Sequence, residues 1–123
     1  MRATDSINRF TSYNAGFAAE SKAKTFLIDN GLDFFTQNYK CKVGEIDLIF
    51  KKQQLWIFVE VKYRGNNASG YATEQVTRSK LRKITKAICW FMNEQNLNIH
   101  HEEIRIDLIA IDDNKLEWLK NLG

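Results

Sequence analysis

Three charged side chains could act together in chemistry: Asp47, Glu60 and Lys62. They lie within residues 43–50 and 55–63, two segments rich in β-branched and aromatic residues that predict the strands of a β-hairpin. Side chains alternate between the two faces of a strand, and the apolar positions of both segments can be buried together on one face. The three charged groups then share the other face, where two carboxylates could hold a hard divalent cation beside a phosphate group.

The connection between the two strands determines how closely the carboxylates approach. Residues 51–54 lack the Gly or Asn that two-residue hairpin turns prefer, so we expect a four-residue loop. This loop would place Glu45 opposite Glu60, with Asp47 diagonal to Glu60 at roughly 7–8 Å between α-carbons. Without a cation, such carboxylates would repel and one would be driven to its neutral form. The apolar face would consist of Ile46, Leu48, Phe50, Leu55, Ile57, Val59 and Val61.

The simplest alternative for these charges is a set of salt bridges, with Lys62 paired to Glu60 or Glu45. Exposed ion pairs contribute only about 0–1 kcal/mol to stability. On central strands beside Trp56 and Phe58 the cluster would be partly desolvated, which makes a purely stabilising role a poor explanation and favours a functional site. For Glu45 both interpretations stay open, a metal role or a pair with Lys62.

The composition predicts one domain over residues 1–123. The 123 residues are 44% hydrophobic and 27% charged, which allows a core without disulfide or metal staples. No apolar run approaches the ~18 residues of a membrane span, and residues 1–14 contain no apolar stretch of signal-peptide type. Two cysteines, Cys41 and Cys89, are too few for a disulfide framework, so we expect reduced thiols in a cytoplasmic protein that has no membrane partner.

Charge is unevenly distributed along the chain. Residues 1–93 hold 15 Lys and Arg against 8 Asp and Glu, whereas residues 94–123 hold 3 against 7. A basic body with an acidic end suits a protein that binds a polyanion on one side. A solvated basic surface that binds nothing is the alternative.

The hairpin needs neighbouring elements to position it. Apolar and small residues at helical spacing predict a helix over 14–30, ended by Asn30-Gly31. A second helix is expected from an N-cap at Thr73 to about Gln95. Further strands are expected at 33–40, 103–112 and 115–122. The resulting order, α-β-β-β-α-β-β, predicts the α/β fold class with a central mixed β-sheet flanked by helices.

The second helix is strongly basic. At 100° per residue, its basic side chains cover the arc opposite its apolar face. A solvated outer face explains several of them, whereas Arg64, directly after the second hairpin strand, could hold a phosphate. The basic residues of the helix are Arg78, Lys80, Arg82, Lys83 and Lys86.

Asp47, followed thirteen residues later by Glu60-Val61-Lys62, resembles the core of the PD-(D/E)XK nucleases. More narrowly, GEIDLI (44–49) and FVEVKYR (58–64) resemble the YraN family of uncharacterised bacterial proteins, a family similar to archaeal Holliday-junction resolvases. Ile46 stands where a proline often precedes the aspartate, and the YraN pattern also lacks that proline. Further matching positions, over nearly the whole chain, are Gly16, Glu20, Val76-Thr77, Lys80 and Arg105-Ile106-Asp107.

The resemblance implies a restriction-endonuclease-like core and a metal site. Asp47 and Glu60 would ligate Mg²⁺ or Mn²⁺, with the Val61 carbonyl as an extra ligand and Glu20 completing the acidic set. Lys62 would orient or deprotonate the attacking water, or stabilise charge on the phosphate. Glu20 is also unusual by itself, since a carboxylate on the helix stripe that faces the sheet either joins a site or reaches out to water.

By the same resemblance we expect an endonuclease that hydrolyses DNA phosphodiester bonds, at branched or damaged DNA, and that forms a homodimer like the resolvases. Its nucleic-acid contacts would be Arg64, Lys80, Arg78 and Lys83. Two other classes stay open: a DNA-binding module that keeps the nuclease fold without useful catalysis, and a structural or assembly protein. Metal uptake and salt-sensitive DNA binding distinguish the three.

Overall fold

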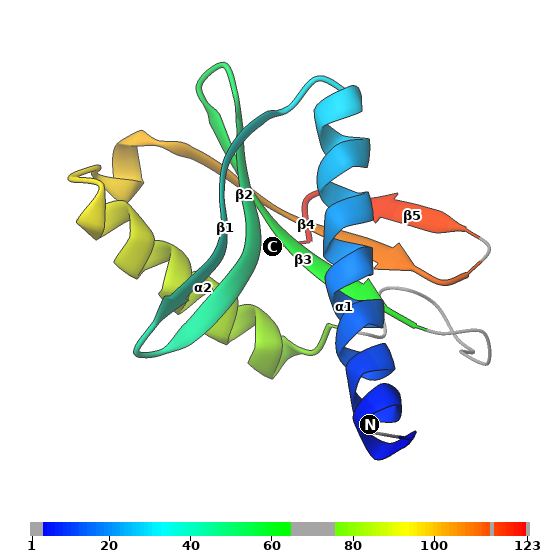
Figure 1. The fold of residues 1–123 in the computed structure, drawn as a ribbon. Helices are drawn as coiled ribbons and strands as arrows, with labels where there is room; N and C mark the ends of the chain where they lie inside the picture. Colours follow the sequence, from blue (N-terminus) through cyan, green and yellow to red (C-terminus); the bar gives the residue numbers. More distant parts are fainter. Residues whose placement is uncertain (1–3, 65–75, 114, 123) are drawn as a thin grey trace.

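A five-stranded mixed β-sheet with one helix on each face forms the protein (Figure 1). The computed structural model describes residues 4–64, 76–113 and 115–122, and within 4–15 it describes the backbone alone. The elements in chain order are α1 (Thr4–Asp29), β1 (Asp33–Cys41), β2 (Gly44–Lys52), β3 (Leu55–Tyr63), α2 (Arg78–Glu94), the 3₁₀ turn η2 (Ile99–His101), β4 (Glu103–Ile111) and β5 (Leu116–Leu119). No helix of this described part is long and apolar enough to cross a bilayer.

The sheet has the order β1-β2-β3-β4-β5. β1, β2 and β3 pair antiparallel, β3 and β4 pair parallel, and β5 returns antiparallel to β4. Parallel neighbours require a long crossover, and the connection from β3 to β4 carries α2 for this purpose. The predicted fold class is therefore confirmed, and the arrangement is consistent with a restriction-endonuclease-like core.

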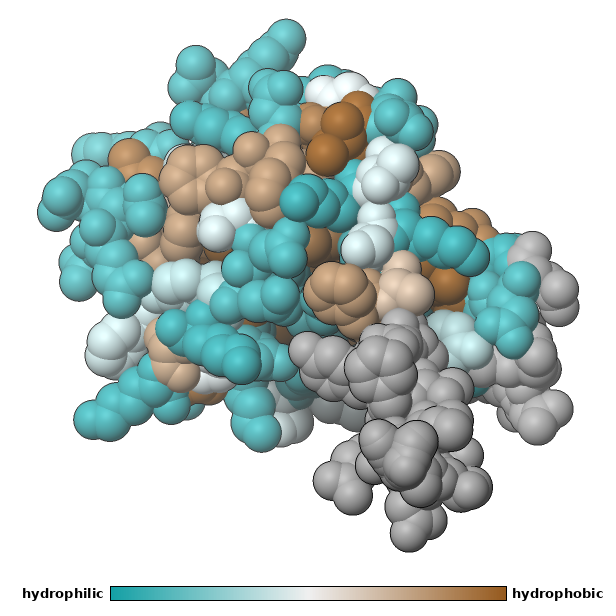
Figure 2. All heavy atoms as spheres, viewed as in Figure 1, coloured by the Kyte–Doolittle hydropathy of each residue, from teal (hydrophilic) through white to brown (hydrophobic). Residues whose placement is uncertain are grey.

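Alternation along β2 and β3 builds two apolar cores on the two faces of the sheet. Leu48 and Val59 turn toward α1, where Ala19, Ala23 and Leu27 are buried against them. The two alanines let the helix axis approach the sheet closely. The turn at Gly31, with φ of 94°, stops α1, and the Leu32 N–H closes it on the Leu27 carbonyl at 3.1 Å. On the face seen in Figure 2, hydrophilic side chains separate small apolar patches.

The opposite face packs on α2. Phe91 lies at the centre of an aromatic cluster, edge-on to Trp56 at 5.5 Å and to Phe58 at 5.7 Å between ring centroids. The expected N-cap at Thr73 lies outside the described residues. α2 begins at Arg78, where the Thr77 hydroxyl accepts the Lys80 N–H at 3.1 Å and caps the first turn.

The β2–β3 connection differs from the four-residue loop that we predicted. Lys52 pairs with Leu55, so the turn is the two residues Gln53-Gln54. Gln53 adopts a φ of 55°, a left-handed conformation that propensity assigns to Gly or Asn. The predicted register was therefore wrong by two residues: Ile49 pairs with Phe58, and Glu45 is not opposite Glu60.

The assignment of Ile46 to the Leu48 face was also wrong. Ile46 packs with Ile49 and Phe58 in the core beneath α2. The β2–β3 ladder ends with the pair Leu48 and Val59, so β2 leaves its partner at this point and its alternation changes. The two strands separate at Asp47.

A buried carboxylate ties the C-terminal segment to the sheet. Asp107 is fully buried. Its two oxygens accept hydrogen bonds from the Nε and Nη2 groups of Arg105, from the indole N–H of Trp118 and from the backbone N–H of Asn121, each at 2.9 Å. Four satisfied donors explain how this charge is tolerated in the core. The network fixes β5 and the chain after it on β4.

We expect Asp107→Ala to lower the free energy of unfolding by about 2–5 kcal/mol, because four donors lose their acceptor and the Arg105 charge loses its partner. Urea denaturation followed by circular dichroism measures this. Glu103→Ala, at an exposed position of the same strand, is the matched control and should change stability by less than about 0.5 kcal/mol. Equal stabilities for the two variants would contradict this account of Asp107.

Candidate active site

Two acidic side chains meet where β2 and β3 separate. Asp47 is 9% exposed and Glu60 6%, so both carboxylates are buried, as is that of Asp107. Beyond the end of the β2–β3 ladder, the Val61 N–H donates to the Asp47 Oδ2 at 2.8 Å. This hydrogen bond fixes one of the two carboxylate oxygens of Asp47. The charge of Asp47 acts on Glu60, so the two carboxylates lie close to each other just beyond the last pair of the β2–β3 ladder.

Two ammonium groups lie against the same oxygen of Glu60. The Lys62 Nζ is 3.8 Å from Glu60 Oε2, and the Lys80 Nζ, reaching from α2, is 3.4 Å away. Lys62 was predicted at this position by strand alternation. Lys80 was predicted as a nucleic-acid contact, and the structure brings it into the acidic set. No signal in the sequence indicated this contact, because the helix was expected to be capped at Thr73 and the Lys80 position depends on the cap at Thr77.

Burial raises the pKa of all three clustered acids. For Glu60 desolvation is the main cause, with a smaller contribution from the Asp47 charge, and together they raise its pKa to about 7 against partial compensation by Lys80 and Lys62. The pKa of Asp47 is raised mainly by desolvation, although the Val61 hydrogen bond opposes it. The pKa of Glu20 is raised by desolvation and by the charges of Asp47 and Glu45. The site is therefore short of positive charge.

Glu20 and Glu45 form the outer part of the acidic set. Glu20 comes from α1, as the helix stripe predicted, and is close enough to Asp47 for the two charges to interact. Glu45 is exposed and pairs across the β1–β2 ladder with Lys40. Both acids line a hollow of about 370 Å³ between α1 and the β1–β2 hairpin. α1 thus contributes a carboxylate to the site from the opposite face to α2.

The donor chemistry of this site fits Mg²⁺ or Mn²⁺. The described residues contain no group of three His, Cys, Asp or Glu side chains already arranged as a cage. Mg²⁺ does not need one, since it commonly takes one or two carboxylates and completes its shell with water and substrate phosphate oxygens. Asp47 and Glu60 supply two hard oxygen donors, and their pKa values are raised mainly by desolvation and to a smaller extent by neighbouring carboxylates, both of which a bound cation would offset.

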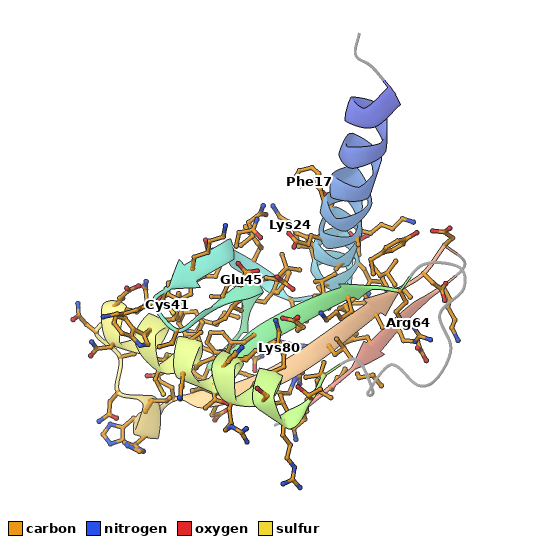
Figure 3. All side chains as sticks on the ribbon, turned by 90° about the horizontal axis from the view of Figure 1, so that it is seen from below. Phe17, Lys24, Cys41, Glu45, Arg64 and Lys80 are labelled. Carbon is orange, nitrogen blue, oxygen red and sulfur yellow. The ribbon has the colours of Figure 1, made fainter. Side chains whose placement is uncertain are left out.

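The remaining predicted contacts are dispersed. Arg64 lies well apart from Lys80 and Glu45 (Figure 3). Its side chain is 8% exposed, and its Nη1 pairs with Glu117 at 3.2 Å, so a phosphate would have to displace Glu117 to reach it. Lys83 has an exposed side chain, and its backbone carbonyl lies against Gly44 of the β1–β2 turn.

Arg78 belongs to a second basic feature on α2. With Arg82 and Lys86 it forms a row along one side of the helix, because residues four apart lie one above another. The row borders a hollow of about 430 Å³, which we call the basic groove. In the described part of the chain, none of these three bases makes an ion pair. The groove is lined by Arg78, Leu81, Arg82, Thr85, Lys86 and Leu122.

Comparison with known proteins identifies similar chains. The model of a family described as "Uncharacterised protein family UPF0102" matches residues 19–111. A UPF0102 protein of Vibrio campbellii is 40% identical over 114 residues, covering 91% of this chain and 93% of the relative. A UPF0102 protein of Vibrio parahaemolyticus is 42% identical over 115 residues (91% and 93%), and one of Photorhabdus laumondii is 38% identical over 115 residues (94% and 91%).

The raised pKa of Glu60 predicts a pH-dependent stability in metal-free buffer. Because its pKa rises from 4.5 to about 7 on folding, the stability that its proton contributes is fully present below pH 4.5 and is lost as pH rises through about 7. Glu60→Gln replaces the titrating carboxyl group with a neutral amide, so the variant does not lose this stability as pH rises. We expect the variant to gain stability relative to the original protein between these pH values, and to keep the gain above them.

Thermal unfolding in EDTA at a series of pH values measures the difference. Glu103→Gln, at an exposed position, is the control and should leave the pH profile unchanged. A stability difference between Glu60→Gln and the original protein that stays constant across this range would contradict the desolvation of Glu60.

Proposed function

The chain belongs to the UPF0102 family, the family that its GEIDLI and FVEVKYR motifs indicate, and we propose that it is a divalent-cation-dependent endonuclease of branched or damaged DNA. One observation carries the proposal. Two buried carboxylates with raised pKa values, Asp47 and Glu60, converge at the end of a strand pair beside the ammonium groups of Lys62 and Lys80. Such a set is costly as a scaffold and suited to phosphodiester hydrolysis.

Each side chain has a role that follows from its position. Asp47 and Glu60 would hold Mg²⁺ or Mn²⁺, with the Val61 carbonyl and Glu20 as further oxygen donors. When bound, the cation would neutralise charge on the scissile phosphate and acidify the attacking water. The Val61 N–H holds Asp47 in one orientation, so this carboxylate needs little rearrangement during the reaction.

The two lysines would have different roles at the phosphate. Lys62 would orient the attacking water and stabilise the negative charge that develops as its oxygen bonds to phosphorus. The attacking water gives up a proton to solvent, the bond from phosphorus to the 3′-oxygen breaks, and the leaving oxygen takes up a proton from solvent. Lys80, which lies 3.4 Å from Glu60, would move to a non-bridging phosphate oxygen when substrate enters.

We expect Asp47→Asn and Glu60→Gln each to abolish measurable Mn²⁺ uptake and to lower DNA cleavage at least about 100-fold, because each removes one of two charged ligands. Titration calorimetry with Mn²⁺ and cleavage of linear, nicked and four-way DNA measure the two effects. Asp33→Asn, at an exposed position of β1, is the control. Cleavage that survives both site variants would locate the activity elsewhere.

The basic groove on α2 supports the proposal that the ligand is a polyanion such as DNA. Arg78, Arg82 and Lys86 repeat at about 6 Å along the helix, a row that suits successive phosphates. We expect the triple Gln variant to weaken DNA binding and to reduce the slope of log K against log salt by about 0.9 for each phosphate that is no longer neutralised. A triple Gln variant of three exposed lysines elsewhere, Lys22, Lys52 and Lys115, is the control.

Anisotropy titrations at several salt concentrations measure these slopes. Equal slopes for the two triple variants would mean that affinity depends on net charge alone and that the groove is not a contact surface.

The alternative function is a DNA-binding module without catalysis. It is favoured by the pairing of Glu60 with both Lys62 and Lys80, which partly satisfies the acidic set without any cation. Salt-sensitive DNA binding without Mn²⁺ uptake would support it. In either case we assign the protein, as one domain, to the cytoplasm on the ground that Cys41 and Cys89 are free thiols, and we expect the homodimer of the resolvases that it resembles.

A further inference from the structure

We propose that Trp90 stacks on a base of a single-stranded stretch of DNA whose phosphates follow the basic groove on α2. The inference rests on the proposed nuclease function and narrows its substrate to DNA that offers several unpaired nucleotides in a row. Trp90 lies on α2 one helical turn after Lys86, the last basic residue of the row that borders the groove.

Trp90 extends this row by one further step. The row that begins at Arg78 advances by four residues at each step, and the step after Lys86 is Trp90. Residues at this spacing follow one another along a single ridge of the helix, with about 5–6 Å between β-carbons. Long side chains of a helix lean toward its N-terminus, which directs the Trp90 ring over the turn that contains Lys86. Three cationic side chains and one aromatic ring thus form a continuous track.

The Trp90 ring is open to a ligand. It is 42% exposed and belongs to neither of the apolar cores on the two faces of the sheet. Within the described ranges of the chain, no ring contact, cation–π contact or hydrogen bond engages its indole. The ring therefore contributes nothing to the packing of the domain that binding would have to disrupt.

The charge along α2 suits a polyanion. The helix carries five basic residues and one acidic residue, Glu94. The Glu94 carboxylate already accepts a hydrogen bond from the Tyr39 hydroxyl at 2.8 Å. Glu94 lies one turn beyond Trp90 and therefore marks the end of the basic track.

A cationic track that ends on an aromatic ring is suited to a single strand. Basic side chains neutralise successive phosphates, and the ring stacks on an unpaired base of any sequence, because every base has a π-face. In a duplex both faces of each base are covered, so stacking on Trp90 would first require unstacking. The three steps from Arg78 to Trp90 cover about 18 Å, a tract of roughly four nucleotides if each side chain contacts one.

A membrane surface also attracts basic helices with a tryptophan, but α2 does not fit one. A helix that lies on a bilayer inserts its apolar face among the lipids. The apolar face of α2 is buried against the sheet through Ile84, Ala87, Ile88, Phe91 and Met92. Trp90 instead lies among charged side chains on the outer side, which favours a nucleic acid over a bilayer.

Binding in EDTA tests the inference without cleavage. Fluorescence anisotropy would compare a short thymidine strand, an abasic strand of the same length and charge, and a fully paired duplex. We expect Trp90→Ala to weaken binding of the thymidine strand by roughly 5- to 100-fold, and that of the other two ligands by less than about 2-fold. Trp90→Phe should restore binding, because an aromatic ring is retained. Ile28→Ala, which removes a 45% exposed apolar side chain from α1, is the matched control.

Tryptophan emission gives a second readout, since stacking on a base quenches an indole. We expect the thymidine strand to quench the emission of the original protein and of Ile28→Ala. The emission of Trp90→Ala should not respond, because its remaining indoles, Trp56 and Trp118, pack in or against the two cores.

Equal weakening of all three ligands by Trp90→Ala, or no weakening, would overturn the stacking role while leaving the nuclease proposal standing. A lower molar mass of Trp90→Ala in light scattering, without selective loss of the thymidine strand, would also overturn it and would make Trp90 a contact between copies of the chain. Selective weakening in a protein that never cleaves DNA would retain the stacking role and remove the catalytic function.

Discussion

The enclosure of two carboxylates between diverging strands is the constraint on which this structure depends. Charged groups withdrawn from water are costly unless they are paired or hydrogen-bonded. Here Asp47 has the Val61 N–H, and Glu60 has the Lys62 and Lys80 ammonium groups, yet the pKa of each acid is still raised. The compensation is therefore incomplete, and the site retains a demand for positive charge.

The scaffold around these acids is built to hold them at that position. The two-residue turn sets the register of β2 on β3, and the separation of the two strands after Leu48 and Val59 leaves the Val61 N–H to the Asp47 carboxylate. On one face, small residues let α1 approach closely enough for Glu20 to interact with Asp47. On the other face, the Thr77 cap starts α2 so that Lys80 reaches Glu60. The local conformations of four separate parts of the chain thus bring one group of side chains together.

Features set by strong local patterns could be predicted from the sequence. Alternation in 55–63 predicted that Ile57 and Val59 are buried on one face of β3, and Asn30-Gly31 predicted the end of α1. Features set by tertiary packing could not. Gln53 accepts a left-handed conformation that its propensity disfavours, because the long apolar ladder on either side outweighs the local cost. Ile46 left its predicted face because the strand pairing ends beside it, which no local pattern encodes.

The positions of the basic groove and of the acidic set bear on the size of the substrate. Lys80, which contacts Glu60, is two residues from Arg78 and hence about 200° around the helix from it. The basic groove therefore lies on the other flank of α2 from the acidic set, separated by about the 10–12 Å width of a helix. A mononucleotide is too short to contact Glu60 and Arg82 together, whereas a polynucleotide of several residues can. If the basic groove and the acidic set act on one ligand, that ligand is a strand and not a free nucleotide, which is what an endonuclease requires.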